Sequence, residues 1–199
     1  MDVEAGGCRQ VECQGDTAEV REGMVKGFRL KRGLWALFVV VAAGLLLPEH
    51  ARIPVQGATA SDWHPKSFWF EPWGASGVHK GIDIFAVRGT PVVSAVPGIR
   101  LYQGELSLGG KVVIVLGPKW RLHYYAHLNE PATPVPLWVA KGRQIGGVGD
   151  SGNARGKPPH LHYSVLSLIP LPWRITTETQ GWKKMFFLDP VDVFTSRGH

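Results

Sequence analysis

Cysteine is nearly absent from this chain of 199 residues, and both cysteines, Cys8 and Cys13, lie close to its start. One C-x4-C pair without a second pair does not supply the four ligands of a structural zinc site. The rest of the chain has no cysteine and therefore needs no disulfide. The sequence neither requires nor excludes an oxidising compartment.

Long charge-free runs are also scarce. Leu34 to Leu47 is a run of fourteen residues without a charge, which is shorter than the roughly 20 apolar residues of a membrane-spanning helix. Basic residues precede it at Lys26, Arg29, Lys31 and Arg32. This layout predicts a signal-peptide core or, if it stays uncleaved, an N-terminal membrane anchor at residues 34–47. A buried core helix is the alternative interpretation.

The leader ahead of this run differs in charge from the rest of the chain. Residues 1–23 contain six acids and two bases, a net charge of −4, and the whole chain carries +6, so the remainder carries +10. Translation from Met24 would give a basic flank followed by the apolar run, which is the usual secretory order. We therefore expect a leader over residues 1–33, of which residues 1–23 are not translated.

The basic body of the chain lacks any nucleic-acid-binding motif, and its lysines and arginines are scattered. We expect no nucleic-acid partner. In electrostatic terms, an anionic cell-wall polymer would suit such a basic surface as well as nucleic acid would.

Glycine (25) and proline (15) are abundant, which favours short strands and many turns over long helices. We expect a linker at 48–62 and a mainly β, antiparallel domain at 63–199. The predicted strands are residues 81–86, 91–96, 98–106, 111–116, 122–127, 144–148 and 160–166. Residues 167–187 form either an extra loop beside a groove or, through Trp173 and Trp182, a cap on the core.

Histidine and aspartate recur in a pattern that suits a metal. His79 and Asp83 lie four positions apart, and His160 and His162 lie two apart. These four side chains supply enough donors for one zinc ion and leave a histidine over, because catalytic zinc takes three protein ligands. Positions four apart in a strand are about 13 Å apart, so the chain must bend. Gly81 permits a bend through a positive φ.

Three motifs carry a family resemblance. They are Val78-His-Lys-Gly-Ile-Asp83, Tyr125-Ala-His-Leu128, and Gly149-Asp-Ser-Gly-Asn153 leading to Pro159-His-Leu-His162. In this order and spacing the chain resembles the lysostaphin/LytM-type zinc metallopeptidases, which cleave peptide cross-links of bacterial peptidoglycan. The resemblance covers roughly residues 73–166, with a further match at Leu188-Asp-Pro-Val191.

The resemblance implies an antiparallel sheet with a groove that holds one zinc ion. The implied metal ligands are His79, Asp83 and His162, and the implied catalytic histidines are His127 and His160. A bound zinc would act as a Lewis acid on the scissile carbonyl and activate a water molecule. His123 is a further groove candidate, since it shares a strand face with Tyr125 and His127 if the segment is regular.

The loop at residues 149–153 is read either as a wall of this groove or as a plain surface turn. Its Asp150 is not expected to be a ligand.

These features predict a periplasmic or extracellular zinc endopeptidase that hydrolyses peptidoglycan, either released or associated with the inner membrane through its N-terminal segment. Two alternatives differ in class. One is a catalytically inactive wall-binding protein or amidase activator of the same fold, although such relatives lose zinc ligands and this chain fills every position. The other is a β-rich carbohydrate-binding module, which would need no set of histidines.

Overall fold

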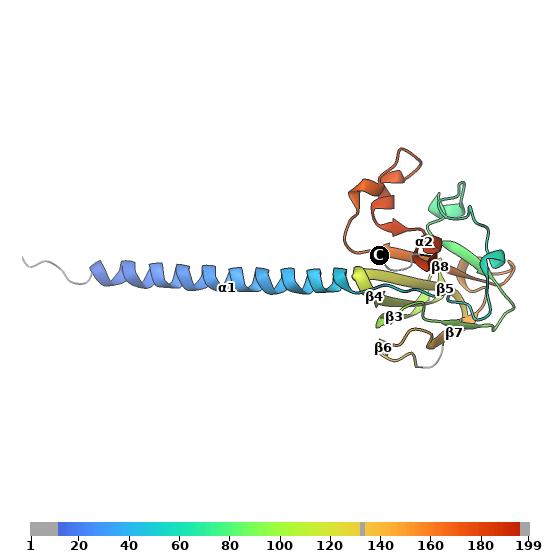
Figure 1. Cartoon of the computed structure of the whole chain (residues 1–199), viewed down its shortest axis with the longest axis horizontal. Coiled ribbons are helices and arrows are strands. Elements are labelled where there is room, and N and C mark those ends of the chain that lie inside the picture. The colour runs from blue at the N-terminus through green and yellow to red at the C-terminus, as the bar shows by residue number, and fades with distance from the viewer. Residues whose placement is uncertain (1–11, 132–133, 196–199) are drawn as a thin grey trace, which may run out of the picture. The chain divides into compact units, whose positions relative to one another are not determined.

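The computed structural model describes residues 12–131 and 134–195 (Figure 1). The first eleven residues of the predicted leader, which include Cys8, lie outside the described residues. The chain divides into two compact units, of which the first ends at Ala43 and the second begins at Gly44.

The N-terminal unit is dominated by helix α1 (Glu12–Leu46), a single helix of 35 residues. It joins the later part of the predicted leader to the apolar run, and it ends two residues before Pro48, which cannot continue a helix. Leu34, Trp35 and Phe38 expose more than half of their surfaces. Within the described ranges, no helix is long and apolar enough to cross a membrane.

The second unit is built on one nine-stranded sheet whose neighbouring strands are all antiparallel. This confirms the predicted fold class. The path of the sheet runs β1-β8-β5-β4-β3-β6, with β7 joining β2 to β5 and β9 pairing with β8 (Figure 1). The strands are β1 (Ile82–Phe85), β2 (Pro91–Val93), β3 (Gly98–Leu106), β4 (Gly110–Gly117), β5 (Arg121–Pro131), β6 (Trp138–Val139), β7 (Gln144–Val148), β8 (His160–Ser167) and β9 (Phe187–Leu188). A short helix, α2 (Pro190–Thr195), follows.

Because side chains alternate along a strand, the sheet has one face in the core and one face at a cavity. On β8, Leu161, Tyr163 and Val165 belong to the buried apolar cluster. The intervening His160 and His162 line a cavity on the opposite face. The core side of the sheet therefore supports the strands that present the histidines.

Residues 48–62, expected to be a linker, are packed against this sheet. The Arg52 amide donates to the Ala95 carbonyl at 3.0 Å, and the Val93 amide donates to the Pro54 carbonyl at 2.8 Å. Val55 is 2% exposed and belongs to the core. Proline is compatible with such an edge position because its missing N–H is not needed there.

Residues 167–187 form a loop with two short 3-10 turns, Pro172–Arg174 and Gly181–Met185. Trp173 is 77% exposed and Trp182 is 56% exposed, so these two side chains do not cap the core. The loop instead contacts the segment before β1, where the Gln180 side-chain amide donates to the Ser76 carbonyl at 2.9 Å. Ser76 lines the cavity, so the prediction of a loop beside the groove agrees with this contact.

Candidate metal centre

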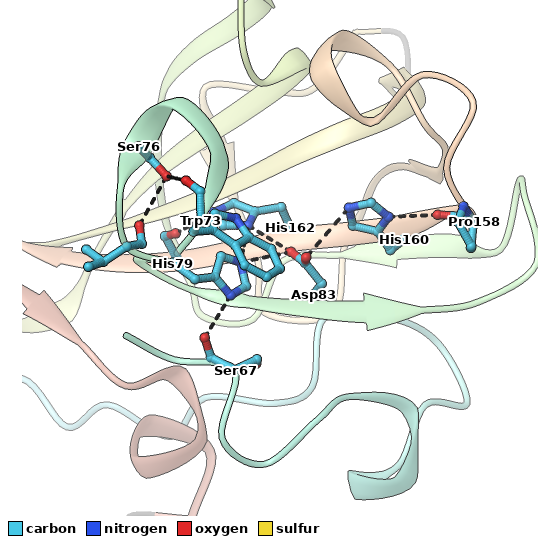
Figure 2. A network of polar contacts seen from close by, with 10 residues as sticks. Ser67, Trp73, Ser76, His79, Asp83, Pro158, His160 and His162 are labelled. Carbon is cyan, nitrogen blue, oxygen red and sulfur yellow. Dashed lines mark hydrogen bonds and ion pairs between the residues drawn. The ribbon is translucent and has the colours of Figure 1, made fainter. Parts of the chain in front are cut away.

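Three of the predicted site residues converge on one point, as Figure 2 shows. Asp83 on β1 is the direct cross-strand partner of His162 on β8, so both side chains leave the same face of the sheet. His79 reaches in from the loop before β1. Its Nε2 lies 3.1 Å from Asp83 Oδ1 and 3.0 Å from His162 Nδ1. The distance from His162 Nδ1 to Asp83 Oδ1 is 2.9 Å.

Gly81 enables this convergence for a reason other than the one predicted. It is not among the glycines with a positive φ. A Cβ at Gly81 would instead lie 2.4 Å from the Tyr163 carbonyl oxygen, 2.4 Å from Ser164 Oγ and 3.1 Å from His162 Cε1. Glycine is needed there because the backbone before β1 passes closely against β8.

The hydrogen bonds of the ligand histidines define which ring nitrogens face the centre. His79 Nδ1 lies 2.9 Å from the Ser67 carbonyl oxygen, which can only accept, so Nδ1 carries the proton. His79 Nε2 therefore presents a lone pair in the neutral ring. His162 Nε2 contacts Ser164 Oγ at 2.9 Å, which leaves Nδ1 to face the centre. Such outer contacts orient the histidines of metal sites.

The three inward atoms fit a zinc ion. When both inward nitrogens are deprotonated, their lone pairs and the carboxylate oxygen repel one another unless a cation lies between them. In a tetrahedral site with bonds of about 2.0 Å, neighbouring ligand atoms are about 3.3 Å apart, close to the separations observed here. Two nitrogens and one oxygen also match the ligand types of catalytic zinc.

The local electrostatics favours the deprotonated forms that a metal requires. Burial alone would raise the pKa of Asp83, but hydrogen bonds and charge interactions with His162 and His79 outweigh it and lower that pKa. Burial lowers the pKa of His162.

We call His79, Asp83 and His162 the triad. His127 and His160 lie beside it, and the two rings are held in the same way. The Nδ1 of His127 donates to the Ser151 carbonyl, and the Nδ1 of His160 donates to the Pro158 carbonyl, each at 2.8 Å. Both rings line the cavity and their centroids lie 5.1 Å apart. The Nε2 of His160 lies 3.8 Å from Asp83 Oδ2, beside the triad (Figure 2). Because each Nδ1 is used in donating to a carbonyl, Nε2 is the atom of each ring that can exchange a proton with a bound molecule. Burial lowers the pKa of His127 to about 4.

His127 faces the cavity because β5 is bulged. Lys111 pairs with Leu128 and Val113 pairs with Tyr125, so two residues of β5 oppose one residue of β4. His127 lies in this bulge and has a φ of 61°. The prediction that His123, Tyr125 and His127 share a face is wrong, because the extra residue reverses the alternation.

His123 is consequently a core residue rather than a groove residue. It is fully buried, and its Nδ1 lies 2.6 Å from the Tyr163 hydroxyl. Its Nε2 lies 3.2 Å from Glu49 Oε1. Burial lowers the pKa of His123.

The loop at residues 149–153 orients His127, because its Ser151 carbonyl accepts the hydrogen bond from the ring. Besides its carbonyl, Ser151 uses its hydroxyl to donate to the Leu128 carbonyl at 2.8 Å. Asp150 pairs with Arg88 at 2.5 Å and is not part of the group formed by His79, Asp83 and His162. Asn153 lines the cavity, so part of this loop forms its wall.

The histidines lie in a cavity of about 540 Å³ with a largely apolar lining. Sequence reasoning missed several lining residues, namely Trp73, Lys80, Phe85, Tyr124 and Lys157. Lys80 lies inside the first motif, and Tyr124 immediately precedes the second, so their positions beside the motifs were the available signal. Trp73 carried no such signal.

Comparison with known proteins agrees with this geometry. Residues 77–168 match the sequence model of peptidase family M23. The chain contains a peptidase M23 domain.

The M23 domain has curated relatives with wall-related names. An L-Ala–D-Glu endopeptidase of Bacillus subtilis is 36% identical over 60% of this chain and 38% of its own length. A peptidoglycan DD-endopeptidase of Vibrio cholerae, ShyA, is 28% identical over 44% of this chain and 20% of its own length. The chain thus spans well under half the length of these relatives.

A solved structure shares the fold of the M23 domain. It is a Ruminococcus gnavus protein named for the glycyl-glycine endopeptidase LytM. It has 25% sequence identity and a TM-score of 0.54, and the match covers 87% of this chain and 70% of the other.

Proposed function

We propose that this chain is a zinc endopeptidase that hydrolyses peptide cross-links or stem peptides of bacterial peptidoglycan. The convergence of His79, Asp83 and His162 beside two further histidines in one cavity is the observation that carries the proposal. The names of the M23 relatives support the choice of substrate.

The proposed chemistry divides the five side chains into two groups. His79, Asp83 and His162 hold one zinc ion, which supplies a Lewis acid and favours deprotonation of water near neutral pH. His127 and His160 exchange protons through their Nε2 atoms. One accepts a proton from the attacking water, and the protonated form donates a hydrogen bond to the developing oxyanion or a proton to the leaving amine.

The intact set of donors argues against an inactive wall-binding or amidase-activating role. A chain that only binds has no need to hold three ligand atoms within 4.8 Å of one another. It also has no need to point two more imidazoles into the same cavity. A carbohydrate-binding module is disfavoured for the same reason.

We also propose that the protein works outside the cytoplasm, in the periplasm or extracellular space, with α1 associated with the inner membrane or removed as a signal. The basic flank from Lys26 to Arg32 and the exposed apolar side chains of Leu34, Trp35 and Phe38 support this location. Fractionation of cells followed by N-terminal sequencing tests it. A soluble cytoplasmic pool contradicts export, and peptides from residues 2–20 contradict translation from Met24.

Digestion of purified peptidoglycan by the full-length protein tests the activity. We expect new amino groups and products whose masses show one added water for each peptide bond cut. The Asp83→Ala variant should release none above background. Products cut within the glycan, or no products from protein that carries a full equivalent of zinc, would contradict the proposed function.

A further inference from the structure

The cavity around the triad has a positive bias. Asp83 is the one carboxylate among its described lining residues, and it belongs to the proposed metal centre. Two lysines, Lys80 and Lys157, also line the cavity. Most of the remaining lining is apolar, so these two ammonium groups are the charges that a substrate peptide meets outside the centre.

Lys80 is held in place without an anionic partner. It is partly buried, and its Nζ donates to the Ser76 carbonyl at 2.9 Å and to the Val78 carbonyl at 3.4 Å. An ammonium group has three donors, so one donor of Lys80 remains for a ligand. Neither carbonyl neutralises its charge.

A second lysine lies behind Lys80. Lys183 is connected through the side chain of Gln180 to the Ser76 carbonyl, which Lys80 also contacts. Its Nζ donates to the Gln180 side-chain oxygen at 2.7 Å, and the Gln180 side-chain nitrogen donates to the Ser76 carbonyl. Within the described chain no carboxylate pairs with Lys80 or Lys183. Two ammonium groups fixed in this way gain most from an anion beside them.

Lys157 adds a second positive charge to the lining of the cavity. In Figure 2, Ser76 and Pro158 lie on opposite sides of the triad. Lys80 Nζ donates to the Ser76 carbonyl, and Lys157 immediately precedes Pro158 and lines the same cavity. The side chain of Lys157 is exposed and is therefore screened more strongly than that of Lys80.

We propose that the groove selects anionic peptides and that Lys80 binds a free carboxylate of the substrate beside the scissile bond, with Lys157 attracting further negative charge to the cavity. This inference rests on the peptide hydrolysis proposed above and specifies its substrate. A neutral, glycine-only cross-bridge cannot use either lysine.

The test uses one set of cross-linked stem peptides in two forms, with their carboxylates free or converted to carboxamides by carbodiimide and ammonia. The zinc-loaded full-length protein is assayed for kcat and KM on each form. Binding of both forms is measured separately on the His160→Ala variant, whose turnover is expected to be slow enough for binding to be read before cleavage. We expect amidation to raise both KM and the binding Kd by about tenfold, as for the loss of one charge-assisted hydrogen bond.

Variants at Lys80 decide whether this lysine causes the preference. Lys80→Met should reduce the ratio between the two forms to less than about threefold, while Lys80→Arg retains it, because Arg keeps the charge. The zinc content of each Lys80 variant checks that the neighbouring His79 is undisturbed. Lys157→Met should reduce the ratio by a smaller factor than Lys80→Met. Lys141→Met is the matched control, since Lys141 is exposed and lies outside the cavity lining.

Equal KM and Kd values for the free and amidated peptides would overturn the inference, as would an unchanged ratio in Lys80→Met. A binding preference for the free carboxylates without any cleavage by the wild-type protein would leave this inference standing and refute the proposed hydrolysis instead.

Discussion

Trp73 lies nearly parallel to the ring of His79, with centroids 4.0 Å apart and an interplanar angle of 24°. The indole also lines the cavity, so it covers one face of a proposed zinc ligand. The Ser67 carbonyl fixes the same imidazole through its Nδ1. His79 is thus oriented by a stacking contact and a hydrogen bond at once.

Replacing Trp73 should weaken zinc binding without removing a ligand. We expect Trp73→Ala to lower zinc affinity by roughly tenfold, the lower end of the effect of losing an outer contact in metal sites. Trp73→Phe keeps an aromatic face and should remain near wild type. Competition with a chromophoric chelator measures all three affinities. Equal values would mean that Trp73 shapes the cavity without positioning His79.

The ligand assignment predicts a larger loss. Asp83→Ala or His162→Ala should abolish bound zinc, because two protein ligands rarely hold the ion against a chelator. Asp150→Asn is the matched control, since Asp150 pairs with Arg88 outside the triad. Metal analysis of the purified variants gives the result. A full equivalent of zinc in Asp83→Ala would refute the assignment.

His127 and His160 should separate metal binding from catalysis. Alanine at either position should leave zinc content near normal and lower kcat by about 100-fold or more, a typical loss for acid–base or oxyanion groups. Zinc content and single-turnover rates are measured on the same samples. If zinc is lost together with activity in His160→Ala, the roles of His160 and His162 are reversed.

The centre and its motifs could be predicted from the sequence, but the reasons for its geometry could not. Strands β3 and β7 have the predicted bounds, and Gly98 begins the first while Gly149 follows the second. Strands β6 and β9 have two residues each, too few for any periodic pattern. The bulge that turns His127 toward the cavity has no composition signal, so regular alternation wrongly placed His123 beside it.

Segment 48–62 gives a second example of this limit. Its prolines and glycine are typical of linkers, whereas its hydrogen bonds and the burial of Val55 depend on partners far along the chain. Glu49 lies in this segment. Its side chain is 2% exposed and pairs with Arg121 and His123.

Loss of Glu49 should therefore destabilise the second unit. Glu49→Ala leaves Arg121 without its buried anion and should lower the free energy of unfolding by about 3 kcal/mol. Glu178→Ala is the matched control, because the pair of Glu178 with Lys184 involves a carboxylate that is 56% exposed, and such pairs contribute little. Urea unfolding followed by tryptophan fluorescence compares the midpoints. Equal midpoints for both variants would show that the Glu49 pair does not stabilise the second unit.

Zinc titration of the metal-free protein with peptidoglycan hydrolysis as the readout tests the central claim most directly. One metal centre built from His79, Asp83 and His162 predicts no hydrolysis without zinc, a linear rise on addition, and saturation at one equivalent. Hydrolysis by metal-free protein in the presence of a chelator, or no hydrolysis at saturating zinc, would contradict the account.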